Sequence, residues 1–512
     1  MSYFVKYAAC KEYERVINMR FNKIMKLIMA LMIVFFACIV CGNITKTVTN
    51  DKNIYINEVD GYKFIIPEGC SVDASFLPYA VRFLSEDCII EIYVEECKTK
   101  DEILSYINYS NTSIASNEAD YNNVTQIERG GKTILSWKRD KLSKITKDKN
   151  HYLKIDIPKN KRVYTIIVKS AREINDYEKY ITALKITKPS KSEHKTPEIK
   201  YATAREFNSE TRQFYNQYLL NAEKIEWGIY QYDYMETEEL SKIENKLDHK
   251  FGLLLLYSEF EDEYDPTKVR AFLDKAYSEE RIVELTLQPK RYHQQGNELF
   301  RVLDGYYDEF LHDYAESVAN FKHPVLFRFT NEMNGDWCEY SGYQMSLDTQ
   351  LYREMYKYIY NIFKKNNADN VIWVWNPNGK SFPDFKWNAE EMYYPGNDYV
   401  DVLGLTLYNT GTFYEGEKWT EFDDLYKPLY EKEIKKYDMP FIITEFSCAR
   451  AGGDKEEWTR KMLENIEEFP NIKLAAWWNG ADFTADGKIA RAYYINDSKE
   501  MCEIFKNYFK NR

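Results

Sequence analysis

Histidine and cysteine are scarce in this sequence, and neither is clustered. The six histidines are spread singly along the chain. Of nine cysteines, Cys38 and Cys41 lie at the end of an apolar N-terminal segment, and the other seven show no CxxC spacing. Zinc sites and disulfide scaffolds need regularly spaced residues, so neither is indicated. One bridge among Cys70, Cys88 and Cys97 stays open, and we expect no metal and no cofactor.

An excess of positive charge is absent as well. The chain carries 69 Lys and Arg against 81 Asp and Glu, a formal net charge of −12. Proteins that bind nucleic acid use clustered positive charge, so we expect no nucleic-acid partner. Aromatic residues are abundant instead, at 16% of the chain with 44 Tyr and 10 Trp. A genome rich in Asn, Lys, Ile and Tyr explains this as well as a need for sugar-stacking surfaces does, and composition leaves both open.

The one long apolar run that we identify spans residues 27–40, and basic residues precede it. Its length of about 14 residues is short for a membrane-spanning helix, which needs about 20. The pattern is typical of an export signal, so we interpret residues 1–50 as a signal segment. A start at Met19 rather than Met1 would give it the usual basic beginning. The two cysteines at its end also fit a lipoprotein signal, so we expect a secreted or cell-surface protein that touches the membrane only through this segment.

Residues 52–187 alternate short apolar runs with turns. Their period-two patterning predicts a small antiparallel α+β domain. No group of residues in it indicates chemistry, so a spacer or packing role is favoured, with targeting or substrate binding as alternatives. The charged, Pro-containing stretch at 188–204 is typical of a linker.

From residue 205 to residue 512 the pattern changes. Apolar runs of strand length alternate with long amphipathic segments, which is typical of repeated βα units around a parallel sheet. Eight such units in roughly 300 residues favour a TIM barrel, the (β/α)8 fold of the α/β class, over an open sheet. The eight strand candidates are 226–231, 251–257, 282–287, 324–331, 371–375, 402–408, 441–445 and 472–478.

Two of these strands finish on a carboxylate. The fourth runs into Asn331 and Glu332, and the seventh ends at Glu445. Reactive groups in a TIM barrel lie at the C-terminal strand ends, and strands four and seven stand on opposite sides of its mouth. Side chains reaching inward there could approach to about 5.5 Å, the spacing of retaining glycoside hydrolysis. A structural salt bridge is the usual explanation for either glutamate alone, but the pair, ringed by Trp and Tyr, favours catalysis.

The barrel region resembles glycoside hydrolase family 26. Four stretches carry the resemblance, and together they cover the barrel but not the N-terminal domain. They are His323–Trp337, Trp373–Pro377, Tyr394–Gly404 and Ile442–Phe446. The resemblance implies a TIM barrel with an acid/base at the end of strand four and a nucleophile at the end of strand seven.

Carried over residue by residue, the resemblance implies that Glu332 is the general acid/base and Glu445 the nucleophile. Tyr408 would hydrogen-bond the nucleophile and keep it ionised. Trp477 would form the aromatic platform under the sugar at the cleavage point, and Trp337 would add stacking nearby. For these three aromatic residues, packing in the core is the alternative.

Three positions depart from the mannanase pattern of the family. Asn331 stands where mannanases have His, Thr406 where they have Asp, and Trp478 where Arg usually follows the tryptophan of strand eight. All three fall around the subsite that recognises the 2-hydroxyl of the sugar, so Asn331 and Trp478 join the expected substrate-binding residues. Arg328 would either support the site electrostatically or form an ion pair inside the barrel.

The resemblance therefore implies a retaining endo-β-glycanase that hydrolyses internal β-1,4 bonds of a plant cell-wall polysaccharide. Most of the family implies β-mannan, whereas the departures favour mixed-linkage β-1,3-1,4-glucan, because a site built for one hydroxyl arrangement rejects another. β-1,3-Xylan is third. A non-catalytic carbohydrate-binding barrel and a metal-dependent hydrolase are the competing classes. The presence of both carboxylates argues against the first, and the scattered histidines argue against the second.

Overall fold

The computed structural model describes residues 53–194, 205–260, 265–289 and 296–512. The expected signal segment and most of the predicted linker lie outside these ranges. The first linker residues are described, and they lie against the N-terminal domain, where the Ser190 amide donates to the Glu58 carbonyl at 2.8 Å. None of the described helices is long and apolar enough to cross a membrane.

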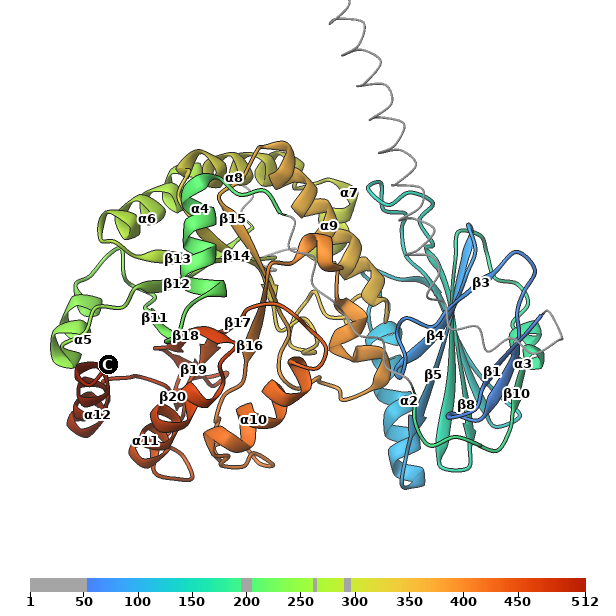
Figure 1. Cartoon of the computed structure of the whole chain (residues 1–512). Coiled ribbons are helices and arrows are strands. Elements are labelled where there is room, and N and C mark those ends of the chain that lie inside the picture. Colours follow the sequence, from blue (N-terminus) through green and yellow to red (C-terminus); the bar gives the residue numbers. More distant parts are fainter. Residues whose placement is uncertain (1–52, 195–204, 261–264, 290–295) are drawn as a thin grey trace, which may run out of the picture.

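Eight parallel strands close into a barrel, which confirms the predicted fold class (Figure 1). The strands are β11 (Glu226–Tyr230), β12 (Leu253–Glu259), β13 (Ile282–Gln288), β14 (Val325–Asn331), β15 (Val371–Asn376), β16 (Val402–Thr406), β17 (Phe441–Phe446) and β18 (Ile472–Trp478). Every residue of β14, β15, β16 and β17 is buried. This is the burial expected of parallel strands that are covered on both faces, and it explains their almost uninterrupted apolar sequences.

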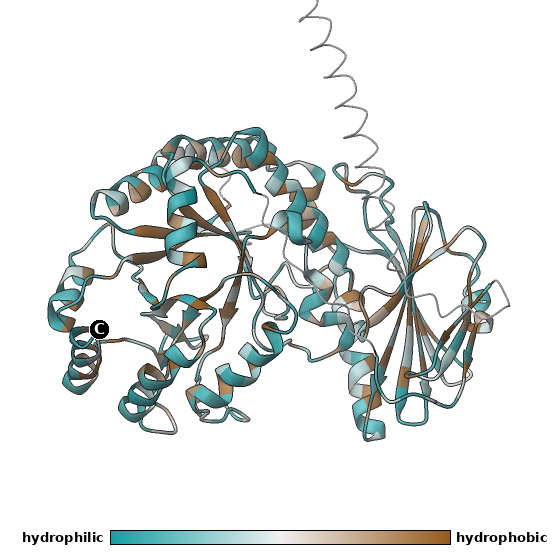
Figure 2. Ribbon diagram, in the orientation of Figure 1, coloured by the Kyte–Doolittle hydropathy of each residue, from teal (hydrophilic) through white to brown (hydrophobic). Residues whose placement is uncertain are grey.

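Amphipathic helices surround the barrel and each buries one side against it. They are α5 (Glu239–Leu247), α6 (Pro266–Ser278), α7 (Glu298–Asp304), α8 (Asp308–Phe321), α9 (Thr349–Lys365), α10 (Phe422–Glu433), α11 (Lys455–Asn465) and α12 (Lys499–Lys510). In α9, Leu351, Met355 and Ile359 share the buried face at a spacing of four residues. Figure 2 shows the resulting contrast between mostly hydrophobic strands and helices of mixed colour.

The N-terminal mouth of the barrel is closed by a short helical segment. This segment consists of α4 (Ser209–Phe214) and the π-helix η1 (Tyr215–Leu220), and its residues Phe214 and Leu219 pack against inward-facing strand residues. The opposite mouth, at the C-terminal strand ends, is therefore the open one. Beside it lies the hairpin of β19 (Ala481–Phe483) and β20 (Ile489–Ala492), which directly follows β18. The chain returns from β15 to β16 through the single-turn helices η2 (Lys386–Asn388), η3 (Glu390–Tyr393) and η4 (Asn397–Tyr399), and η4 lies just before the start of β16, at the other end of the barrel.

The N-terminal domain is the predicted α+β unit, built on a seven-stranded antiparallel sheet of order β3-β4-β5-β9-β8-β7-β6. The strands are β3 (Ser71–Asp73), β4 (Ala80–Leu84), β5 (Cys88–Glu96), β6 (Asn122–Arg129), β7 (Lys132–Lys138), β8 (His151–Lys159) and β9 (Arg162–Ser170). Cys70, Cys88 and Cys97 are free, so the bridge left open by the sequence is not formed in this structure.

Both faces of this sheet are covered. On one face lies a smaller antiparallel sheet of β1 (Ile54–Asn57), β2 (Tyr62–Ile65) and β10 (Leu184–Ile186), with helix α3 (Glu178–Ala183) beside it. On the other face, helix α2 (Lys100–Ala115) lies between the sheet and the barrel (Figure 1). Buried residues of the sheet, of α2 and of the barrel form one continuous hydrophobic cluster, so the two units share a core.

Candidate active site

The end of β14 is the first element of the site, and its backbone is unusual. The pairing of β14 with β15 shifts register between Arg328 and Asn331. Thr330 and Glu332 both have positive φ angles, 56° and 54°, which L-residues adopt at a cost in free energy. The Glu332 amide donates to the Asn376 carbonyl at 2.8 Å, which anchors the turn. This bulge directs the side chains of Asn331 and Glu332 at the barrel mouth.

Glu445, at the end of β17, is held by three donors. The Tyr257 hydroxyl donates to one carboxylate oxygen, Arg328 Nη2 lies 3.4 Å from that same oxygen, and Asn331 Nδ2 donates to the other at 3.2 Å. Burial raises the pKa of Glu445 to about 8, because its side chain is almost inaccessible to water. The three donors stabilise the ionised form and so oppose that effect.

Arg328 is fully buried and lies between two carboxylates. Its guanidinium is 3.3 Å from Glu284 and 3.4 Å from Glu445, and it donates to Thr286 and Asn376 at 2.8 Å each. Burial raises the pKa of Glu284 to about 7, and the positive charge of Arg328 opposes that rise. Arg328 thus forms the ion pair inside the barrel that was one of the two alternatives, and the same guanidinium lies beside Glu445.

Glu332, directly after β14, is the second carboxylate of the site. Its carboxylate accepts from Asn378 Nδ2 at 2.5 Å and from Trp337 Nε1 at 3.4 Å. Burial raises its pKa above the usual range, while the hydrogen bond from Asn378 and the charge of Arg328 act in the other direction. A raised pKa favours the protonated carboxyl, which is the state that a general acid needs.

Asn331 connects the two glutamates. Its Nδ2 contacts Glu445, and the next residue along the chain is Glu332. Its Oδ1 accepts hydrogen bonds from Gln288 and, at 3.2 Å, from the Tyr340 hydroxyl. Because both ends of the amide are engaged, its orientation is fixed with the donor toward Glu445.

The adjacent tryptophans of β18 face opposite ways, as strand geometry requires. Trp477 is fully buried, packs against Phe446 and against Phe505 of α12, and donates to a carbonyl at 2.8 Å. The expectation that Trp477 forms the sugar platform is therefore wrong, because its ring lies behind the barrel wall. Trp478 lies at the mouth, where it stacks on Tyr230 with a centroid distance of 5.4 Å. The platform role fits Trp478.

Tyr408 differs from its expected role as well. It follows the end of β16, and its ring contacts Trp478 and Tyr493 at centroid distances of 6.2 and 5.4 Å. Among the described residues, the tyrosine hydroxyl that reaches Glu445 is that of Tyr257 on β12. Tyr408 thus belongs to the aromatic wall of the mouth, while Tyr257 holds the carboxylate.

Exposed aromatic side chains gather at this same mouth. Six aromatic residues that are at least 43% exposed lie on segments that directly follow barrel strands: Tyr232, Trp337, Phe382, Phe413, Tyr414 and Phe483. Exposed aromatic rings are costly unless a ligand covers them, and flat rings suit the apolar faces of sugars. Their shared placement at the mouth is the one that a sugar-stacking surface would need.

The family model described as Glycosyl hydrolase family 26 matches residues 288–469, a range that contains both Glu332 and Glu445. That match lies within the barrel and agrees with the resemblance seen in the sequence.

Three curated proteins illustrate the range of relatives that this chain matches. Endoglucanase H of Acetivibrio thermocellus is 29% identical over 241 residues, which cover 46% of this chain and 25% of that protein. A mannan endo-1,4-beta-mannosidase of Bacillus subtilis strain 168 is 28% identical over 187 residues, covering 36% and 46%. Beta-1,3-xylanase TXYA of a Vibrio species is 22% identical over 222 residues, covering 40% and 46%. The chain thus spans less than half the length of each of these relatives.

Solved structures are similar too. An endo-beta-1,4-mannanase double mutant of Cellulomonas fimi covers 61% of this chain and 76% of its own length, with 17% identity and a TM-score of 0.47. The Bacillus subtilis mannanase man26 covers 58% and 94%, with 20% identity and a TM-score of 0.41.

Several residues of the site were not predicted from the sequence. Gln288 ends β13, Tyr257 lies two residues before the end of β12, and Asn378 lies just past β15, so all three share the position near a strand end that singled out the glutamates. That position was the available signal. Tyr340 could not be found in this way, because it belongs to the loop after β14 and returns to Asn331 only in the folded chain.

Proposed function

We propose that the barrel is a retaining endo-β-glycanase in which Glu332 is the acid/base and Glu445 the nucleophile. The observation that carries the proposal is the link through Asn331, which contacts Glu445 through its amide and is followed directly by Glu332. Two glutamates from opposite strands of the barrel thereby share one buried, aromatic-lined mouth. The match to the family 26 model supports the same assignment.

The proposed reaction follows from the surroundings of Glu332 and of Glu445. Glu445 attacks the anomeric carbon while Glu332 gives its proton to the departing glycosidic oxygen, which leaves a glycosyl ester on Glu445. Glu332, now ionised, then takes a proton from water, and the resulting hydroxide displaces Glu445. The donors Tyr257, Asn331 and Arg328 stabilise the Glu445 carboxylate at both ends of this cycle.

For the substrate we propose a neutral β-1,4-linked polysaccharide backbone, mixed-linkage β-1,3-1,4-glucan first. Two observations support this choice. Asn331 presents an amide donor next to Glu445, and the Thr406 hydroxyl is already engaged by Thr444 and Asn376, 2.9 and 3.1 Å away. The mannanase pattern has His and Asp at these two places. The similarity to an endoglucanase points the same way.

β-Mannan is the second candidate, because several of the curated relatives are named as mannan endo-1,4-beta-mannosidases. We also propose that the protein is exported through residues 1–50, since such a polymer lies outside the cell. The apolar run at 27–40 supports export.

The experiment is a comparison of polymers. The purified protein is incubated with barley glucan, lichenan, mannan and β-1,3-xylan, and the products are identified by chromatography. We expect oligosaccharides from glucan or mannan, and loss of activity by at least about 10³-fold in Glu332→Gln and in Glu445→Gln. The matched control is Glu309→Gln on the exposed side of α8, which should keep wild-type activity. Near-native activity of either site variant would contradict the assignment.

A further inference from the structure

The N-terminal domain is attached to the barrel by buried charges. Lys169 of β9 lies 2.7 Å from Asp348, which begins α9, and 2.9 Å from Glu91 of β5, and all three are almost fully buried. The Tyr152 hydroxyl donates to the same Asp348 at 3.1 Å. Buried pairs of this kind hold only in one geometry, since separating them leaves unpaired charges in an apolar core. The domain is therefore docked in a fixed position, unlike a spacer.

The docking surface includes the loop that carries Glu332. Tyr109 of α2 donates to Asp336, the neighbour of Trp337. Tyr121 donates to the Gln344 carbonyl at 3.0 Å in the same loop. Helix α2 thus lies beside the segment that begins at the acid/base.

The loop after β15 makes the second half of this contact. Trp387 Nε1 donates to Ser110 of α2 at 3.2 Å, and the Phe385 ring lies 6.1 Å from that of Tyr109. Phe382, three residues earlier, packs on Trp337 at 5.3 Å. An aromatic surface therefore runs from the catalytic carboxylate across two loops to α2.

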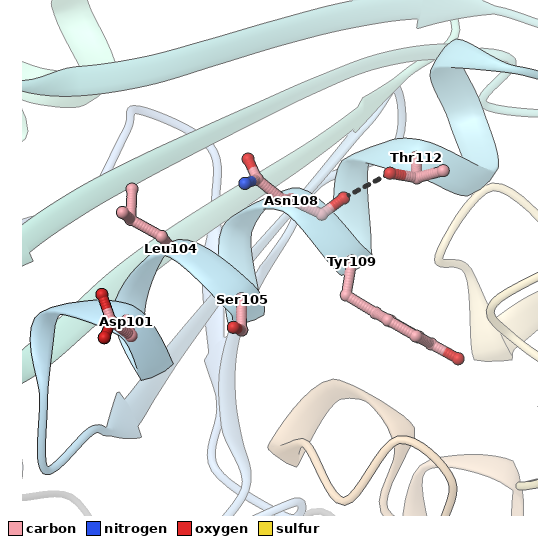
Figure 3. Close-up of a pocket in the computed structure, with 6 residues that line it drawn as sticks. All are labelled: Asp101, Leu104, Ser105, Asn108, Tyr109 and Thr112. Carbon is pink, nitrogen blue, oxygen red and sulfur yellow. Dashed lines mark hydrogen bonds between the residues drawn. The ribbon is translucent and has the colours of Figure 1, made fainter.

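On α2 this surface meets a shallow, open hollow of about 490 Å³. Its lining comes from one side of the helix: Asp101, Leu104, Ser105, Asn108, Tyr109 and Thr112. Figure 3 shows these side chains along α2, with the Tyr109 ring extending toward the neighbouring ribbons of the barrel. Leu104 is 56% exposed, an apolar side chain amid amide, hydroxyl and carboxylate groups. This mixture suits a sugar, which has apolar ring faces and hydroxyls at its edges.

We propose that helix α2 extends the substrate cleft and binds distal sugar residues of the same polysaccharide chain that occupies the catalytic mouth. We infer the same polysaccharide as the ligand because the hollow is continuous with the catalytic mouth. Tyr109 lines the hollow, and its hydroxyl donates a hydrogen bond to the loop that carries Glu332 and Trp337. The inference rests on the proposed function and adds that the N-terminal domain recognises long chains. Short oligosaccharides that fill only the mouth do not reach it.

The test compares long and short substrates in the full chain. Leu104→Ser removes the exposed apolar group of the hollow, and Ser105→Trp fills the hollow, while Tyr109 stays intact and keeps its bond to the barrel. Ile65→Ser is the matched control, because Ile65 is 52% exposed on β2 of the small sheet at the other face of the domain. For each protein, kcat/KM is measured on the polymer that the wild type cleaves and on a short oligosaccharide of the same linkage.

We expect the ratio of polymer to oligosaccharide kcat/KM to fall about five-fold in both α2 variants and to stay constant in Ile65→Ser. An active wild type whose ratio is unchanged in the α2 variants would overturn this inference and leave the proposed function intact. A wild type that cleaves none of the polymers would overturn both.

Discussion

Asn331 shows how much a single side chain decides at this site. Its amide fixes the position of the Glu445 carboxylate, its backbone carbonyl accepts from Tyr340 at 2.7 Å, and its place in the bulge sets the direction of Glu332. Both glutamates were predictable from the sequence, because each ends an apolar strand. The hydroxyl of Tyr257 beside Glu445 was not, because it reaches the carboxylate from another strand.

The hydroxyl of Tyr257 is expected to control the ionisation of Glu445. Tyr257→Phe removes a donor to the carboxylate, so the pKa of Glu445 should rise further. The acidic limb of the pH profile of kcat/KM should then move to higher pH, and kcat/KM at neutral pH should fall about 10- to 100-fold. Tyr408→Phe, measured in parallel, should leave the acidic limb in place. An unmoved limb in Tyr257→Phe would contradict this role.

The two tryptophans of β18 should separate activity from stability. Trp478→Ala removes the ring at the mouth, so kcat/KM should fall about 10- to 100-fold with little change in unfolding. Trp477→Ala leaves a cavity between β18 and α12, so the free energy of unfolding should fall by about 3–5 kcal/mol. Activity assays and urea unfolding of both variants check this. The opposite pattern would restore Trp477 as the platform. The sequence could not decide between them. Strand alternation shows that two neighbouring residues face opposite ways, but it does not show which of the two tryptophans faces the mouth.

At the scale of elements, the strands were predicted within two residues because continuous apolar runs bounded by polar segments identify buried parallel strands. The bulge in β14 was not predictable, because it depends on pairing with β15. The packing of α2 and β9 against the barrel could not be predicted from the sequence either. It is made by contacts between residues far apart in the sequence, such as the pair of Lys169 and Asp348, for which no local pattern exists.

The junction between β9 and α9 should respond strongly to loss of one charge. Lys169→Met leaves Glu91 and Asp348 buried without their shared cation, so we expect a loss of about 3–5 kcal/mol in the free energy of unfolding. Lys185→Met on the exposed side of β10 is the control and should change stability by less than about 0.5 kcal/mol. Urea titrations followed by tryptophan fluorescence measure both. Small losses of unfolding free energy of equal size in both variants would show that this buried ion pair contributes little to stability.

At the scale of the whole molecule, buried carboxyls should make stability depend on pH. Burial raises the pKa of Glu284 from 4.5 to about 7. The folded chain then holds this proton at pH values where the unfolded chain has lost it. Its contribution to stability is complete below the unfolded pKa and is lost as pH rises through the folded pKa.

We therefore expect the contribution of Glu284 to stability to decline between about pH 5 and about pH 7. Glu284→Gln cannot titrate at this position, so the free energy of unfolding of the wild type, relative to that of the variant, should fall as pH rises across this window. Urea unfolding of both proteins at several pH values measures the difference. A relative stability that is constant or grows with pH would contradict the raised pKa of Glu284.

The central claim is the division of labour between Glu332 and Glu445, and azide rescue tests it most directly. Each glutamate is replaced by Ala, and the variant is incubated with azide and an aryl β-glycoside that the wild type cleaves. In Glu332→Ala the glycosyl ester still forms and azide displaces it, so the product should be the β-glycosyl azide, identified by proton NMR. In Glu445→Ala azide takes the place of the nucleophile, so the α-glycosyl azide should form. Exchanged configurations, or wild-type hydrolysis by either variant without azide, would contradict the assignment.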